Sequence, residues 1–117
     1  MSEFYNWGNS PKEDAAMLHI VGNMKTLKGE LISAKNIFKG VIGVLENVDS
    51  KTNLTKELGI FAVQMPEYKI FTKDAEYAKK TIRKVCSGEL SVLNALQKFR
   101  CALTEVEELL KMLDNYP

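Results

Sequence analysis

The sequence contains a single histidine and only two cysteines in 117 residues. Protein metal sites need several histidine, cysteine or carboxylate ligands at short spacings, and His19 has neither a nearby cysteine nor a Glu-x-x-His pattern around it. Cys86 and Cys101 lie fifteen residues apart, which matches no zinc or redox motif. We therefore expect a structural or surface role for His19, no metal and no cofactor.

The chain also has almost no excess of one charge, because sixteen basic and fifteen acidic residues leave a formal charge of +1. Proteins that bind nucleic acid across their whole surface usually carry a larger basic excess. Any electrostatic function must therefore come from local clustering of charge.

Long apolar runs are missing as well. The longest is four residues, as at 60–63, whereas a transmembrane helix needs about 20. The first residues have neither the basic region nor the apolar region of a secretory signal. Two cysteines without an export signal indicate free thiols in a reducing compartment. We expect a cytoplasmic protein that does not associate with a membrane.

The residues that are present are typical of one globular domain, 1–117, with an apolar share of 45% and a charged share of 26%. Ser10 and Pro11 match the N-cap and first position of a helix. From there, apolar residues occupy two positions of a seven-residue repeat. They are Met17, Ile20, Met24, Leu27, Leu31, Ala34, Phe38, Val41, Leu45 and Val48. This pattern predicts one long amphipathic helix over about 11–48.

Four glycines weaken this prediction, because each costs about 1 kcal/mol relative to alanine in a helix interior. They are Gly22, Gly29, Gly40 and Gly43. The stretch 41–45 is also compatible with a strand, but a strand would not keep the heptad phase. We favour the helix, in which the glycines serve either the close approach of another backbone or a bend.

The connecting segment, 49–72, has two interpretations. Asn53 is a suitable N-cap, and apolar residues between 54 and 65 are spaced as one helical face that Pro66 would end. The alternative is a β-hairpin with strands at 60–63 and 68–71. We favour a short middle helix.

A second amphipathic pattern covers about 73–114, with Thr72 as its candidate N-cap. Its apolar positions keep one phase that only Glu89 interrupts. Ser87 and Gly88 are typical of a break between helices. The segment is therefore either one helix of about forty residues or a helix that is kinked or broken near 87–88.

Two long helices joined by a short segment should fold back as an antiparallel hairpin. The apolar residues beside the two seams exceed what one partner helix can cover. They include Ile37, Ile42, Val44, Leu93, Ala95 and Leu109. We expect an all-α hairpin that completes a helical bundle by forming a homodimer. The alternative is that the middle segment and the N-terminal residues cover these side chains within one chain.

Three aromatic residues, Phe4, Tyr5 and Trp7, lie in the first ten residues, before any helix signal. Aromatic side chains contribute strongly to both cores and interfaces. The segment 1–10 is therefore either a strap packed over the helices or an exposed hook for a partner.

Basic residues are concentrated within 69–84, and the predicted patch consists of Lys79, Lys80, Arg83 and Lys84. On a helix, the last three share one exposed face. This face is either simply solvated or binds an acidic protein or nucleic acid. Nearby aromatic residues at 68, 71 and 77 would in the last case stack on bases.

No catalytic constellation stands out, and Cys86 is the only nucleophile to consider, because Arg83 and Lys84 precede it closely. We expect no enzyme, but a non-enzymatic helical protein–protein interaction module such as an adaptor, inhibitor or assembly subunit. The alternative is a small nucleic-acid-binding regulator that uses the basic face around 79–84.

Overall fold

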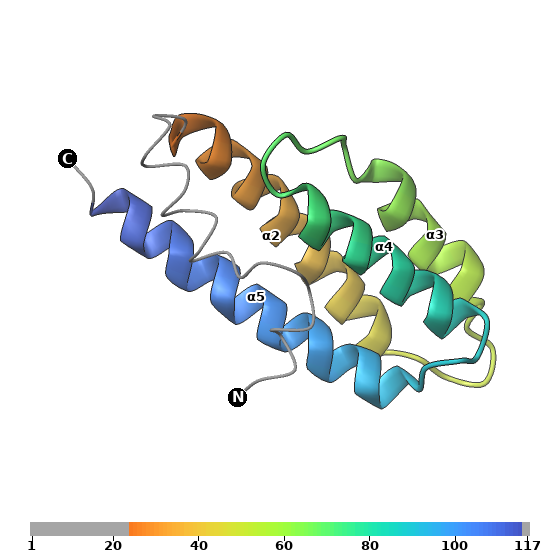
Figure 1. The fold of residues 1–117 in the computed structure, drawn as a ribbon. Coiled ribbons are helices and arrows are strands. Elements are labelled where there is room, and N and C mark those ends of the chain that lie inside the picture. The colour runs from red at the N-terminus through yellow and green to blue at the C-terminus, as the bar shows by residue number, and fades with distance from the viewer. Residues whose placement is uncertain (1–23, 116–117) are drawn as a thin grey trace.

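A computed structural model gives the structure of residues 24–115 (Figure 1). Within that range the chain forms four α-helices and no strand, which confirms the predicted all-α class. The helices are α2 (Met24–Glu46), α3 (Leu54–Gln64), α4 (Thr72–Cys86) and α5 (Val92–Asp114). The predicted helix start at Pro11 and the segment 1–10 lie outside the described residues.

Successive helices run in opposite directions, and α2 lies along α5 while α3 lies along α4 (Figure 1). The described part of the first predicted helix, α2, therefore packs along α5, which is the second half of the segment predicted at 73–114; the first half of that segment, α4, packs along α3 instead. None of the described helices combines the length and apolarity needed to cross a bilayer.

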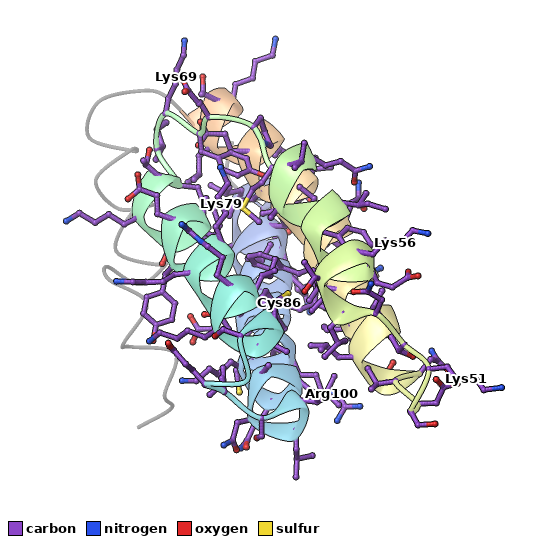
Figure 2. All side chains as sticks on the ribbon, turned by 90° about the vertical axis from the view of Figure 1, so that its right-hand side faces the viewer. Lys51, Lys56, Lys69, Lys79, Cys86 and Arg100 are labelled. Atoms are coloured by element: carbon purple, nitrogen blue, oxygen red, sulfur yellow. The ribbon has the colours of Figure 1, made fainter. Side chains whose placement is uncertain are left out.

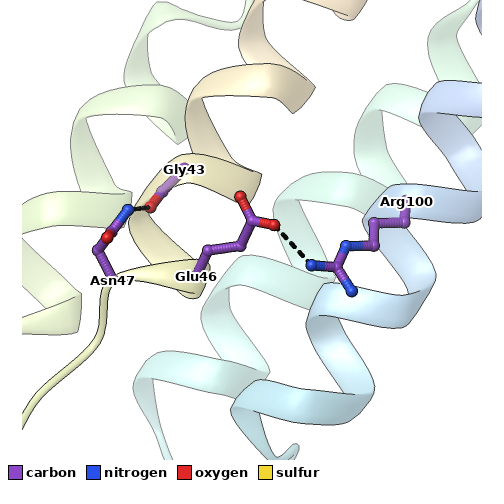
Figure 3. A network of polar contacts seen from close by, with 4 residues as sticks. All are labelled: Gly43, Glu46, Asn47 and Arg100. Carbon is purple, nitrogen blue, oxygen red and sulfur yellow. Dashed lines mark hydrogen bonds and ion pairs between the residues drawn. The ribbon is translucent and has the colours of Figure 1, made fainter.

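The heptad pattern correctly identifies the buried face of α2. The pattern residues that are buried there are Leu27, Leu31, Ala34, Phe38, Val41 and Leu45. The strand alternative for 41–45 is wrong, because this stretch is helical. The helix ends at Glu46, slightly before the predicted end at 48, and the Asn47 side-chain amide donates to the carbonyl of Gly43 at 2.7 Å (Figure 3).

The middle segment is helical, so the hairpin alternative is wrong. Asn53 caps α3 as predicted, because its side-chain oxygen accepts the N–H of Lys56 at 3.2 Å. Leu58 and Met65 are buried on the core side. The helix ends at Gln64, just before Pro66, which lacks the N–H that a continuing helix needs.

The interpretation of 73–114 as one unbroken helix is wrong, and the break near 87–88 is the alternative that the structure bears out. Gly88 has a φ of 81°, which glycine adopts without steric cost. Ser91 then caps α5 by accepting the N–H of Asn94 at 3.1 Å. Glu89, which interrupts the apolar pattern, lies exposed in this turn.

Phe38 of α2 connects the helices in the centre of the core. Its ring centroid lies 5.6 Å from that of Phe99 on α5 and 6.4 Å from that of Phe71, the residue before α4. All three side chains are almost fully buried. Such aromatic pairs add about 0.5–1.5 kcal/mol to the stability that burial alone provides.

Ion pairs between α2 and α5 accompany this apolar contact. Lys28 pairs with Asp114, and Nζ of Lys35 lies 3.8 Å from Oε2 of Glu107. Nη2 of Arg100 lies 2.6 Å from Oε2 of Glu46 (Figure 3). Exposed pairs of this kind contribute about 0–1 kcal/mol each. They therefore specify the register of the two helices more than they stabilise the fold.

Most of the apolar excess from which we predicted a dimer is covered within one chain. Ile37, Ile42, Ala95 and Leu109 are all buried, whereas Leu93 is 73% exposed. These four side chains are therefore buried within a single chain, without a second subunit. Dimerisation itself stays a prediction.

Gly40 lets α3 approach α2 closely, through a side chain and not through the backbone that we expected. A Cβ atom at Gly40 would lie 2.3 Å from Cε1 and 2.6 Å from Cζ of Phe61. A Cβ at Gly43, one turn further along α2, would meet nothing within 4 Å. The two glycines thus form a matched pair for testing this contact.

We expect Gly43→Ala to raise the free energy of unfolding by about 1 kcal/mol, because alanine is the better helix former. Gly40→Ala gains the same propensity but must displace the Phe61 ring, which costs about 1–3 kcal/mol. Urea denaturation should therefore find Gly40→Ala less stable than Gly43→Ala by about that amount. The difference should shrink in a Phe61→Ala background, and equal stability of the two variants would contradict the contact.

Candidate functional site

The start of α4 is held by a carboxylate from α2. Glu30 accepts the backbone N–H groups of Lys69, Ile70 and Phe71, at 2.9 Å for Phe71 and at 3.0 and 3.2 Å from its two oxygens for Ile70. Phe71 is the N-cap of α4 and has no side-chain capping bond of its own. Glu30 thus stabilises the approach to the helix, at the end where the helix dipole favours negative charge.

The predicted N-cap role of Thr72 is wrong. Thr72 is the first residue of α4, and its hydroxyl donates to the carbonyl of Tyr68. The hydroxyl therefore stabilises the turn that leads into α4, while Glu30 satisfies the backbone N–H groups that an N-cap side chain would otherwise accept.

Tyr68 provides a second anchor for the same turn. Its hydroxyl donates to Oγ of Ser33 on α2 at 3.0 Å, and its ring packs edge-on against Phe71 with centroids 5.9 Å apart. Tyr68 and Phe71 are only 6% and 1% exposed. These two rings therefore belong to the core and are not placed to stack on nucleic-acid bases, as the nucleic-acid alternative would require, whereas Tyr77, the third residue named for that role, is half-buried on α4.

The anchored helix α4 has one apolar face and one basic face. Its buried residues include Ala75, Ala78, Ile82 and Val85, which are the predicted seam positions. On the opposite side, Lys80, Arg83 and Lys84 are exposed and Lys79 is half-buried. We call Lys79, Lys80, Arg83 and Lys84 the basic face. Figure 2 shows Lys79 on α4 beside α3, which carries Lys56.

The basic face differs from three of the basic residues on α2 and α5. Lys28, Lys35 and Arg100 each pair with a carboxylate on the neighbouring helix. Among the described residues, no side chain of the basic face has an acidic partner within ion-pair distance. Four positive charges are therefore concentrated on six residues of one helix, and no ion pair joins any of them to a carboxylate of the described residues.

Acidic residues border this face at both ends. Glu76 shares with Lys80 and Arg83 an open depression of about 530 Å³ on α4. Glu89 lines a second depression of about 370 Å³ with Lys84 and Ser87. Small-molecule sites usually enclose most of their ligand. These open, charged depressions are better suited to contact with another macromolecular surface.

Of the other candidate residues, the structure describes only the two cysteines, which do not form one site with the basic face. Cys86 is half-buried and its thiol donates to the carbonyl of Leu54 on α3 at 3.6 Å, while Cys101 is half-buried on α5. Phe4, Tyr5, Trp7 and His19 lie outside the described residues. Within the described range, no group of histidine, cysteine and carboxylate side chains is arranged to hold a metal ion.

Glu30 and Ser33 are the residues that sequence analysis missed. They lie one turn apart on α2 beside the heptad seam, where polar residues normally face solvent. Glu30 accepts backbone N–H groups of a segment about forty residues away in sequence. Every non-proline residue has such a group, so the pattern of side chains does not indicate which segment Glu30 contacts.

Because of Tyr68, the stability of the protein should fall as the pH rises in the alkaline range. Burial raises the pKa of its hydroxyl, the hydrogen bond to Ser33 lowers it, and the charge of Glu30 raises it, with a net increase above 10.0. The folded state therefore disfavours the ionised form. The protonated Tyr68 hydroxyl therefore contributes its full stabilisation below pH ~10, which is the pKa of tyrosine in the unfolded chain. This stabilisation is lost as the pH rises through the higher pKa of the folded state.

We expect the free energy of unfolding, measured with urea between about pH 8 and 11, to fall more steeply in the wild type than in Tyr68→Phe. The variant has no hydroxyl to ionise at this position, but it retains the other tyrosines and all lysines. Parallel pH profiles for the two proteins would show that Tyr68 is not preferentially protonated in the folded state.

The chain matches no family model, no curated protein and no solved structure. The role of the basic face is therefore argued from its own residues, their exposure and their charge.

Proposed function

We propose that this protein is a non-enzymatic protein–protein interaction module that uses the basic face of α4 to bind an acidic partner protein. One observation carries the proposal: four basic residues, Lys79, Lys80, Arg83 and Lys84, gather within six positions of α4 and have no ion-pair partner among the described residues, whereas Lys28, Lys35 and Arg100 on α2 and α5 are paired. A cluster of like charges is unfavourable by itself. A carboxylate-rich partner surface would supply the missing counter-charge.

The chemistry of the basic face suits carboxylates. Arg83 presents a planar guanidinium that can form two parallel hydrogen bonds with one carboxylate. Lys80 and Lys84 are exposed on neighbouring turns and add point charges. Binding that depends on such exposed charges should be fast and should weaken as salt screens them.

Two further segments supplement this surface. α3 exposes Ile60 (51%) and Val63 (85%) one turn apart, although single exposed apolar residues are common and carry little weight alone. Phe4, Tyr5 and Trp7 stay a predicted contact element outside the described residues.

A nucleic-acid-binding regulator is the second candidate, because phosphates would neutralise the same four basic residues. Two observations make it the weaker one. Tyr68 and Phe71 are buried and do not offer stacking surfaces, so that of the three aromatic residues considered for this role only the half-buried Tyr77 lines the basic depression. Glu76 and Glu89 place negative charge at both ends of the basic face, where a continuous phosphate backbone would pass.

We expect charge reversal of the basic face to abolish partner binding without unfolding the protein. The variant is Lys80→Glu, Arg83→Glu, Lys84→Glu in the tagged full-length chain. Captured proteins from an extract of the source cells, at low salt and after nuclease treatment, should include acidic proteins that this variant loses by about tenfold or more. Thermal melting checks that the fold is retained.

The matched control reverses three exposed lysines on other elements, so that the net charge changes equally. It is Lys39→Glu, Lys51→Glu, Lys56→Glu. This control should capture the same proteins as the wild type. Equal losses in both variants would refute a specific role for the basic face. In a parallel capture without nuclease, loss of co-purifying nucleic acid from the α4 variant alone, with no protein affected, would favour the second candidate.

A further inference from the structure

The contact between α2 and α5 contains two regularly spaced ion pairs between lysines of α2 and carboxylates of α5, beside the reversed pair of Arg100 on α5 with Glu46 on α2. Lys28 and Lys35, seven residues apart on α2, pair with Asp114 and Glu107, seven residues apart on α5. Seven residues span about two helical turns, so side chains at this spacing lie on one stripe of each helix. The two helices run in opposite directions, which matches the order of the pairs (Figure 1).

The outward side of α4 repeats this basic spacing. Lys73 and Lys80 are seven residues apart, and Lys84 follows one turn later. All three side chains are exposed, and none forms an ion pair with a described residue. We call Lys73, Lys80 and Lys84 the α4 lysine stripe. It extends over about 17 Å of the helix at 1.5 Å per residue.

We propose that the α4 lysine stripe binds an acidic amphipathic helix of a different protein, with carboxylates that recur at seven-residue spacing. This inference rests on the proposed function and deepens it, because it names the kind of partner that the same helix surface binds. The ion pairs would repeat, between two proteins, the arrangement that already joins α2 to α5.

A second copy of this chain is a poor occupant. The acidic residues with the matching spacing, Glu107 and Asp114, already pair with Lys35 and Lys28 of their own chain. Binding the stripe of another copy would require these pairs to break. The carboxylates must therefore come from another protein.

A phosphate backbone also fits the stripe less well than a helix does. Glu76 lines the same depression as Lys73 and Lys80. Its carboxylate would repel successive phosphates, whereas a partner helix can place a basic or neutral residue opposite it. The partner's carboxylates then meet the lysines alone.

The test uses a synthetic probe and the full-length protein labelled with ¹⁵N. The probe is a helix-forming peptide of alanine and glutamine with glutamate at every seventh position. The control peptide has the same composition, but its glutamates lie on different faces of the helix. NMR titration at low salt measures both the affinity and the residues of the protein that respond.

We expect the regularly spaced peptide to bind about tenfold more tightly than the rearranged one, because only its carboxylates meet the stripe together. The shifts should lie on α4, and Lys73→Gln with Lys80→Gln should remove them. The matched control, Lys39→Gln with Lys51→Gln, should bind like the wild type.

Equal affinity for the two peptides, or shifts away from α4, would overturn the inference. Tighter binding of an oligothymidylate than of either peptide would also overturn it, in favour of phosphate. The two proposals can fail separately. If the cell-extract capture depends on the basic face but the two peptides bind equally, the proposed function stands and this inference fails, because the module then binds proteins without recognising a regularly spaced acidic helix.

Discussion

The carboxylate of Glu30 on α2 is the main polar contact that holds the start of α4. It accepts N–H groups from three consecutive residues that precede the helix, none of which a side chain of that segment caps. Tyr68 adds its hydrogen bond to Ser33, and Phe71 places its ring against Phe38 in the core. Polar and apolar anchors thus meet at the same turn, and the outward direction of the basic face depends on them.

α2 therefore organises the fold from three sides. Its heptad seam and its ion pairs face α5, Gly40 receives Phe61 from α3, and Glu30 anchors the start of α4. α4, by contrast, buries one face and leaves a concentrated positive charge on the other. This division between a scaffold helix and an exposed helix supports the proposed binding role.

The sequence allowed prediction of those features that depend on nearby residues. Heptad spacing identified the buried face of α2, and Asn53 and Pro66 bounded the middle helix. The apolar residues keep the same helical periodicity before and after Ser87 and Gly88, so the sequence did not decide whether the helix breaks there. The break depends on the φ angle of Gly88, which the spacing of apolar residues does not reveal. Glu30 was missed and Thr72 misassigned because a tertiary contact, invisible in local spacing, satisfies the N–H groups before α4. Exposure of the basic face followed from helical periodicity, but the roles of Tyr68 and Phe71 did not.

Amide hydrogen exchange of Lys69, Ile70 and Phe71 tests most directly whether Glu30 holds α4 in place. These three amides precede the helix and have no partner within it. We predict that in the wild type they exchange about tenfold or more slowly than the exposed amide of Glu67, after correction for intrinsic rates, and that Glu30→Ala removes this protection. Unprotected exchange at all three amides in the wild type would contradict the anchor, and with it the account of how the basic face is presented.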